Sequence, residues 1–239
     1  MTEAVQSNAR ADRRLPVIAI DGPAGAGKST LAAHLARRFG FLNLETGAMY
    51  RALALKAIEL DIGFDDEAAL AALTTTTTIQ LQPQQEGNRV LLDGLDVTQR
   101  VRDRDVAEAA SRVSMHPRVR TWMVAQQQAM GAKGGVVMEG RDIGTKVFPD
   151  AEVKIFLDAA PEVRGQRRFQ QGVRAQSAVT KESEIVAMRE RDARDRSRAA
   201  SPLEPAADSV LLDSTSMTFE EVMARSEEIV RQKLAVTSL

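Results

Sequence analysis

The residues with the clearest chemical meaning are those of the glycine-rich stretch 22–30, which reads GPAGAGKST. Glycines at positions 22, 25 and 27 precede Lys28 and Ser29 in the spacing GxxxxGK[ST]. Glycines allow backbone N–H groups to turn inward around a phosphate, where a β-carbon would obstruct the approach. In this motif the lysine reaches the outer phosphates of a nucleoside triphosphate, and the serine hydroxyl binds Mg²⁺. The stretch therefore predicts a nucleoside triphosphate site.

The sequence on either side of the stretch supports that prediction. Residues 16–20 are apolar, as expected for a buried strand, and apolar residues then recur at helical spacing from Leu31 to Phe39. A strand, a glycine loop and a helix N-terminus together form a phosphate site, because the helix dipole adds positive charge there. The alternative is a glycine-rich turn with a solvated lysine. We expect the triphosphate to contact Gly22, Pro23, Ala24, Gly25, Ala26, Gly27, Lys28, Ser29 and Thr30.

Arginines are concentrated in a second stretch. Residues 161–198 contain ten Lys or Arg and six Asp or Glu, whereas the whole chain has a net charge near −1. Arg191, Arg194, Asp195 and Arg198 recur at helical spacing and share one face of a helix. Such a face can be merely solvated and paired, but phosphoryl transfer between two polyanions also needs arginine forks to offset negative charge. The spacing alone leaves both alternatives open.

Three shorter clusters are further candidates for a site. Arg167 and Arg168 precede residues 172–180, which we expect to interrupt the helix and to let an arginine-bearing segment close over phosphates. Residues 46–51, TGAMYR, place a hydroxyl, a ring and an arginine at a helix start. Residues 140–145, GRDIGT, follow an apolar strand, and ligands of parallel sheets bind at the carboxyl ends of strands. The alternatives are a capping threonine with a core tyrosine, and a loop salt bridge.

Strands alternate with helices along the chain, which predicts an α/β fold with a parallel sheet and helices on both faces. Asp93 and Gly94 form a hairpin signal between two short strands. The threonine run 74–78 is β-branched and alternates with the residues up to Leu81, which favours a strand over a low-complexity linker, so a small antiparallel sheet is expected over residues 75–98. Strands are expected at 16–20, 41–44, 74–81, 89–92, 95–97, 134–138, 153–157 and 209–212, and helices at 45–61, 67–73, 103–130 with a break at Pro117, 181–198 and 218–234.

Composition limits the classes of protein that fit. A net charge near −1 disfavours a general nucleic-acid binder, which usually carries a broad basic excess. The chain contains no cysteine, which excludes disulfides and fits a reducing cytoplasm. It has no apolar run near the length of a membrane span, and its first fourteen residues are too polar for a signal peptide. We expect a cytoplasmic monomer with a disordered lead-in over residues 1–14.

Taken together, these stretches resemble the bacterial cytidylate kinases, which pass a phosphate from ATP to CMP or dCMP. The matching pieces are collinear and span nearly the whole chain after residue 15. The glycine loop alone indicates only an NTPase or kinase, whereas the GRDIGT and RERDARDRSR stretches are more specific. The pieces are IAIDGPAGAGKST (18–30), LETGAMYRALA (44–54), LDGLDVT (92–98), ASRVSMHPRVR (110–120), GRDIGTKVFPDAEVKIFLDA (140–159) and RERDARDRSRAASPLEPAADSVLLDST (189–215).

This resemblance implies a role for each matching residue. The glycine loop would hold ATP, with Mg²⁺ at Ser29, and the residues acting on the transferring phosphoryl group would be Lys28, Arg167, Arg168 and Arg194. The acceptor site for CMP or dCMP would comprise Thr46, Tyr50, Arg51, Ser111, Arg120, Arg141, Asp142, Arg191, Asp195 and Arg198. Of these, the phosphate would be bound by Arg51, Arg141 and Arg191, the cytosine by Ser111, Arg120 and Asp142, and the ribose by Asp195 and Arg198.

The resemblance also implies a division of the chain. A P-loop NTPase-type core would comprise residues 15–45, 113–160 and 182–239, with a nucleoside monophosphate (NMP)-binding insert at 46–112 and a short helical lid at 161–181. Glu45 and Glu139 depart from the pattern, because some relatives have the shorter aspartate there. Residues 172–180 match nothing distinctive, which leaves the lid boundary open.

Rival functions are weaker. Another small-molecule kinase of this fold would act on AMP, UMP, shikimate or a sugar acid. A nucleotide-regulated binding module would not need two sets of phosphate-binding arginines. A nucleic-acid-processing ATPase is disfavoured by the neutral net charge. Direct transfer to a phosphate oxygen needs no side-chain base, and we expect His34 and His116 to be structural or surface residues.

Overall fold

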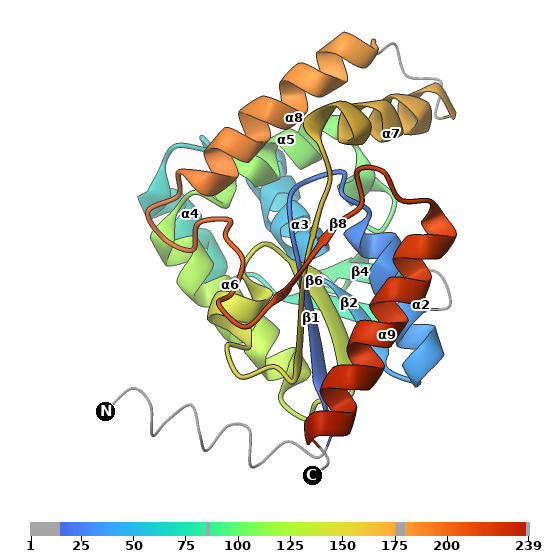
Figure 1. The fold of residues 1–239 in the computed structure, drawn as a ribbon. Helices are drawn as coiled ribbons and strands as arrows, with labels where there is room; N and C mark the ends of the chain where they lie inside the picture. The colour runs from blue at the N-terminus through green and yellow to red at the C-terminus, as the bar shows by residue number, and fades with distance from the viewer. Residues whose placement is uncertain (1–14, 85–86, 175–179, 238–239) are drawn as a thin grey trace.

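The computed structural model describes residues 15–84, 87–174 and 180–237, so the expected lead-in at 1–14 lies outside it. Its centre is a five-stranded sheet in the order β2-β6-β1-β7-β8 (Figure 1). The strands are β1 (Val17–Asp21), β2 (Leu42–Glu45), β6 (Val136–Gly140), β7 (Val153–Asp158) and β8 (Val210–Asp213). All neighbours in this sheet pair in parallel, which confirms the predicted α/β fold. The segments that follow the strands therefore meet at one edge of the sheet.

Helices cover both faces of the sheet. On one face, α2 (Lys28–Phe39) and α9 (Phe219–Thr237) lie side by side in Figure 1 and pack over Ile18 and Ile20 of β1. On the other face, Val17 and Ala19 join a cluster completed by α6 (Pro117–Gly131), which begins at its proline as predicted. Burial on both faces explains why β1 is apolar at nearly every position. No helix in the described part of the chain has the length and apolar character to span a bilayer.

The predicted small antiparallel sheet is present as a separate unit. It consists of β3 (Ile79–Pro83), β4 (Asn88–Leu92) and β5 (Leu95–Asp96), with the Asp93-Gly94 turn between the last two strands. Both turn residues have positive φ angles, 51° and 85°, as the hairpin signal predicts. The helices of this region are α3 (Thr46–Glu59), α4 (Glu67–Thr74), the 3₁₀ turn η1 (Arg100–Arg102) and α5 (Arg104–Val113).

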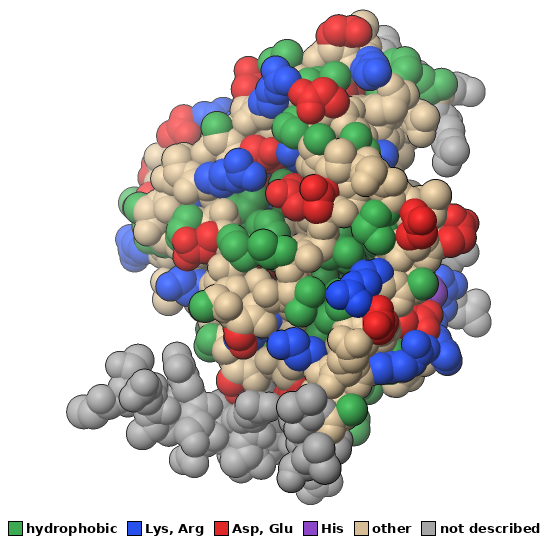
Figure 2. Space-filling view, in the orientation of Figure 1, with side chains coloured by type: hydrophobic (Ala, Val, Ile, Leu, Met, Phe, Trp, Pro, Cys, Tyr) green, Lys and Arg blue, Asp and Glu red, His purple; other side chains and the backbone are tan. Residues whose placement is uncertain are grey.

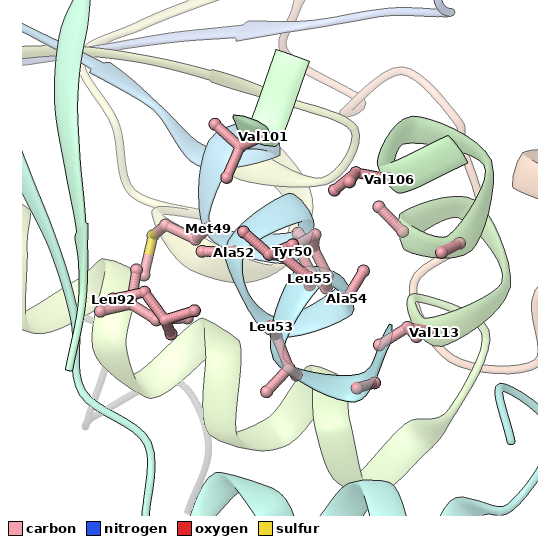
Figure 3. Close-up of a cluster of buried hydrophobic side chains, with 14 of the residues drawn as sticks. Met49, Tyr50, Ala52, Leu53, Ala54, Leu55, Leu92, Val101, Val106 and Val113 are labelled. Atoms are coloured by element: carbon pink, nitrogen blue, oxygen red, sulfur yellow. The ribbon is translucent and has the colours of Figure 1, made fainter. Parts of the chain in front are cut away.

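Helix α3 is the centre of the core in this region. Met49 and Leu53 are completely buried. Figure 3 shows the side chains of α3 packed between Leu92 of β4 on one side and Val106 and Val113 of α5 on the other. This packing holds the first turn of α3 directly after β2, at the edge of the parallel sheet where ligands of such sheets bind.

The threonine run is where the prediction of a strand is wrong. Thr74 ends α4, a turn follows, and β3 begins only at Ile79. The hydroxyl of Thr74 donates to the Ala71 carbonyl at 2.7 Å, and that of Thr77 donates to the Leu73 carbonyl at 2.6 Å. Threonine favours strands through its branched side chain, but its hydroxyl also satisfies the free carbonyls at a helix end. In this segment the local hydrogen bonds favour a helix end and a turn over a strand.

The arginine-rich stretch forms two packed helices, α7 (Pro161–Arg174) and α8 (Lys181–Arg196), at the top of Figure 1. They approach closely at Gly165, where an added β-carbon would lie 2.4 Å from Ile185 Cγ1. The interruption expected at residues 172–180 begins later than predicted, because α7 continues through Gly172 to Arg174, and a single glycine weakens a helix without ending it. Residues 175–179 lie outside the described part of the chain. The sequence predicts that Arg198 lies on the second of these helices, but α8 ends two residues before it.

Gly22 offers a test of how the glycine loop is seated on the sheet. It has a φ of 146°, and a β-carbon there would lie 1.9 Å from the Leu157 carbonyl oxygen of β7. Gly22→Ala should therefore lower the free energy of unfolding by more than about 3 kcal/mol, measured by urea titration. The matched control is Gly63→Ala, where no atom lies within 4 Å of the added carbon. Equal stabilities of the two variants would contradict the close approach.

Candidate active site

The glycine loop connects β1 to α2. Gly25 and Gly27 have φ angles of 76° and 103°, in the left-handed region that favours glycine. Gly27 is followed by the first residue of α2, so the N-terminal N–H groups of that helix face the loop. Lys28 Nζ donates to the Pro23 carbonyl at 2.8 Å, which folds the lysine side chain back over the loop. The loop thus combines inward-facing N–H groups with a positive side chain.

A first cavity of about 580 Å³ opens over this loop. It is lined by residues 25–30 together with Arg167 and Arg168 of α7, so the structure brings these sequence-predicted groups together. Arg167 Nη1 donates to the Ala26 carbonyl at 3.1 Å, and Arg167 Nη2 donates to the Ser214 carbonyl at 3.3 Å. The lining also includes the apolar side chains of Met217 and Phe219, which lie just before α9 and at its first residue. The cavity therefore combines cationic and apolar side chains.

A second cavity of about 480 Å³ adjoins the first and shares Gly25, Lys28, Ser29 and Arg168 with it. Eight basic and three acidic side chains line it, so it is strongly positive. The predicted acceptor residues among its lining are Thr46, Tyr50, Arg51, Arg120, Arg141, Asp142, Arg191 and Arg198. They come from α3, α6, the segment after β6, α8 and the segment after it, and the fold gathers them at one edge of the sheet.

Several buried polar atoms of this cavity have no hydrogen-bond partner among the described residues. They are Tyr50 Oη and the Nε atoms of Arg51, Arg120, Arg191 and Arg198. Buried donors are normally paired, and each one left unpaired destabilises the protein. The pattern is that of a site whose hydrogen bonds are completed by an anionic ligand with further polar groups.

Three predicted acceptor or transfer residues lie outside the lining of both cavities. Ser111 and Arg194 line a neighbouring cavity between α5 and α8. Asp195 is fully buried and pairs with Arg141 Nε at 2.9 Å and with Arg198. Asp195 therefore adjoins the cavity through the two arginines that line it.

Two ion-pair networks orient the arginines. Arg120 Nη2 donates to Asp142 Oδ2 at 2.5 Å, and the Arg120 guanidinium carbon lies 5.4 Å from the centre of the Tyr50 ring. Burial acts to raise the pKa of Asp195, but Arg141 and Arg198 outweigh it and hold that pKa at about 2. Burial and the charge of Arg141 lower the pKa of Arg191 to about 9. Positive charge is thus crowded here beyond what the carboxylates neutralise.

The donor set beside the loop fits Mg²⁺. Ser29 Oγ donates to Glu139 Oε1 at 2.9 Å, so a hydroxyl and a carboxylate converge next to Lys28. Burial raises the pKa of Glu139, and the nearby charge of Lys28 only partly opposes this increase. Mg²⁺ takes oxygen ligands and is usually held by one or two protein groups with substrate phosphates and water. No larger cluster of His, Cys, Asp and Glu suited to a metal occurs among the described residues.

Comparison with known proteins decides the family. The family model for cytidylate kinase matches residues 18–232. The chain belongs to the cytidylate kinase family. It is 50% identical over 209 residues to the cytidylate kinase of Pelotomaculum thermopropionicum, covering 87% of this chain and 92% of that protein. It is 46% identical to the cytidylate kinase of Aeromonas salmonicida, covering 93% and 97%. It is 47% identical to that of Geobacillus thermodenitrificans, covering 93% and 99%.

A solved structure shares the fold of this cytidylate kinase family member. An uncharacterized protein from Eubacterium ventriosum superposes with a TM-score of 0.50, covering 93% of this chain and 99% of that one. The two sequences are 12% identical, so this likeness speaks only to the arrangement of strands and helices.

Two residues that hold the site together, Arg164 and Asp192, are not among those predicted from the sequence. Arg164 is 1% exposed; its Nε donates to the Ala159 carbonyl at 2.7 Å, and its Nη1 donates to the Ala24 carbonyl of the glycine loop at 3.0 Å. It also forms a bidentate ion pair with Asp192 of α8. Arg164 thus joins the loop, the start of α7 and α8. Nothing in the sequence separates it from the other arginines of this stretch.

The Arg164–Asp192 pair predicts a large loss of stability when one partner is removed. Asp192→Ala leaves a buried, unpaired guanidinium and should destabilise the protein by about 3–5 kcal/mol. The control is Glu162→Ala, which removes an exposed ion pair with Arg189 between the same two helices. That variant should leave the urea midpoint nearly unchanged. Equal midpoints for the two variants would show that the buried pair does not hold α7 to α8.

Proposed function

We propose that this chain transfers the γ-phosphoryl group of ATP directly to CMP or dCMP, giving ADP and CDP or dCDP. The observation that carries the proposal is the meeting of two cavities at Gly25, Lys28, Ser29 and Arg168. One cavity has the loop for a triphosphate, and the other is cationic with unpaired buried donors. A phosphate of each nucleotide would meet at the shared wall.

On the donor side, residues 22–30 would bind the ATP phosphates through backbone N–H groups. Lys28, Arg167, Arg168 and Arg194 would offset the charge on the transferring phosphoryl oxygens. Ser29 and Glu139 would hold Mg²⁺, whose charge adds to that of the side chains when it is bound.

On the acceptor side, Arg51, Arg141 and Arg191 would bind the CMP phosphate, supported by Thr46 and Tyr50. Arg120 and Asp142 would read the cytosine edge, with Ser111 approaching from the neighbouring cavity. Asp195 and Arg198 would bind the ribose hydroxyls. Support comes from the unpaired donors of Tyr50, Arg51 and Arg191, and from the unpaired hydroxyl of Ser111.

The transfer itself would need no covalent enzyme intermediate. An acceptor phosphate oxygen would form a bond to the γ-phosphorus, while the bond to the bridging oxygen breaks and its electron pair leaves with ADP. No side-chain base is required, because a phosphate oxygen is already deprotonated near neutral pH. His34 and His116 lie elsewhere, bonded to Glu227 and to the Phe64 carbonyl, respectively.

The surroundings of this reaction follow from the same proposal. The partners would be small-molecule nucleotides rather than nucleic acid, in keeping with the interspersed acidic and basic side chains on the face drawn in Figure 2. The chain would act as a cytoplasmic monomer. Residues 46–112 would move as the NMP-binding insert and residues 161–181 as the lid, closing over both substrates to exclude water.

The first experiment is an ADP-release assay with MgATP and each of CMP, dCMP, UMP, AMP or no acceptor. We expect rapid turnover with CMP and dCMP only, because a polar base site built from Arg120 and Asp142 rejects the wrong base edge. A preference for UMP or AMP would replace the assigned acceptor. Slow hydrolysis unaffected by any monophosphate would favour a nucleotide-regulated switch.

ATP binding should take up a proton above neutral pH. Burial and the charge of Arg141 lower the pKa of the Lys28 ammonium to about 7 in the free protein. Bound phosphates favour the ammonium and raise this pKa again. Protons are therefore taken up at pH 8 but not at pH 6, and ATP affinity falls as pH rises above 7.

Calorimetry in Tris and in HEPES at pH 8 measures this uptake, because the two buffers release different heats on losing a proton. Lys28→Arg, which keeps its proton throughout, should show a smaller dependence on the buffer. A heat of ATP binding that is identical in both buffers for the unaltered protein would contradict the lowered pKa.

A further inference from the structure

Asp21 is a buried carboxylate that the proposed reaction does not use. It is the last residue of β1 and stands directly before Gly22 of the glycine loop. Its side chain is part of the interior, with the residue only 5% exposed. A carboxylate so far from water is tolerated only where hydrogen bonds or opposite charges compensate for lost hydration. The partners of Asp21 therefore indicate what it does.

Both carboxylate oxygens of Asp21 accept hydrogen bonds from the same segment of backbone. Oδ1 accepts a hydrogen bond from the Ile143 N–H at 2.8 Å, and Oδ2 accepts one from the Gly144 N–H at 2.7 Å. These residues begin the π-helical turn η2 (Ile143–Val147), whose first N–H groups have no partner within the turn. The approach leaves little room for a side chain at Gly144, because a β-carbon there would lie 3.3 Å from Asp21 Oδ2.

The segment that Asp21 holds carries two of the acceptor-cavity side chains. Arg141 and Asp142 immediately precede the bound N–H groups, and both line the second cavity. Asp142 accepts from Arg120, and Arg141 donates to Asp195, so each has a fixed partner on a different helix. A shift of the backbone at 143–144 would therefore move both side chains away from their partners.

The charge of Asp21 is a weaker explanation for its presence. Burial raises its pKa to about 7, whereas the two backbone N–H groups and Lys28 act to lower it. Lys28 is thus among its electrostatic neighbours, but the direct contacts of Asp21 are with the acceptor segment. Its geometry therefore favours an effect on acceptor binding over one on ATP.

We propose that Asp21 is a positioning residue for the acceptor, which fixes the backbone at Ile143 and Gly144 and thereby orients Arg141 and Asp142 toward the monophosphate. Asp21 connects the start of the glycine loop to the segment after β6, whose side chains would bind the acceptor. This inference rests on the proposed function and adds a residue that contacts neither nucleotide.

The test is Asp21→Asn, assayed against CMP and ATP separately. An amide keeps one accepting oxygen, but its NH₂ group faces the other backbone N–H. We expect KM for CMP to rise about tenfold, as for the loss of one charge-assisted hydrogen bond. KM for ATP should change less than about twofold, and the ratio of kcat/KM for CMP over UMP should fall.

The matched control is Glu152→Gln, because Glu152 Oε2 accepts from the Val17 N–H at 2.8 Å at the opposite end of the same strand. It should leave both KM values and the CMP/UMP ratio unchanged. Equal increases in both KM values for Asp21→Asn, or an unchanged KM for CMP, would overturn the proposal.

A second variant covers the case in which Asp21→Asn does not fold. Gly144→Ala crowds the same contact from the other side and should also raise KM for CMP selectively. If Gly144→Ala folds and binds CMP normally, the proposal is wrong. If the unaltered protein phosphorylates no monophosphate at all, the proposed function has failed instead, and that result is distinguishable from a failure at Asp21.

Discussion

Buried positive charge is the constraint on which this site depends. Arg120, Arg141, Arg164 and Arg198 each reach a carboxylate, because a guanidinium withdrawn from water needs a partner. The carboxylates around the second cavity are nevertheless fewer than the basic side chains. Arg191 has a lowered pKa and an unpaired Nε. In the proposed reaction a polyanionic nucleotide would supply the missing negative charge, so the same crowding that destabilises the free protein would favour the bound state.

The parallel sheet brings that charge to one place. Strand β1 pairs with β6 so that Asp21 lies opposite Gly140, and β2 pairs with β6 so that Glu45 lies opposite Glu139. Three segments far apart in the sequence therefore end at one edge, where the glycine loop, the first turn of α3 and η2 begin. The apolar faces of the strands set the register, and the register sets which polar residues meet.

Much of this arrangement could be predicted because its signals are local. The glycine loop, the apolar strands and the Asp93-Gly94 turn each depend on a few consecutive residues, and the structure confirms the strands and the turn. The strand predicted over the threonine run is wrong, because the threonine hydroxyls bond to carbonyl groups at the end of α4. The interruption predicted from Gly172 onward starts later, because α7 extends to Arg174. The family resemblance supplied the acceptor residues, whose roles stay predictions.

The partnerships between distant charges could not be predicted from local patterns. Asp192 and Arg164 are 28 residues apart and lie among many similar arginines and carboxylates. Asp21 and Ile143 are 122 residues apart, and their contact depends on the pairing of β1 with β6. Such pairs follow from strand order and register, which a single sequence does not display.

The close approach of α7 and α8 at Gly165 has a mechanical consequence. Two helices in direct contact are also joined by the buried pair of Arg164 and Asp192, so a displacement of one is transmitted to the other. Arg167 and Arg168 of α7 line the first cavity, and Arg191 of α8 lines the second. The helix contact therefore couples the two cavities mechanically, because the cationic side chains of both are mounted on one pair of joined helices.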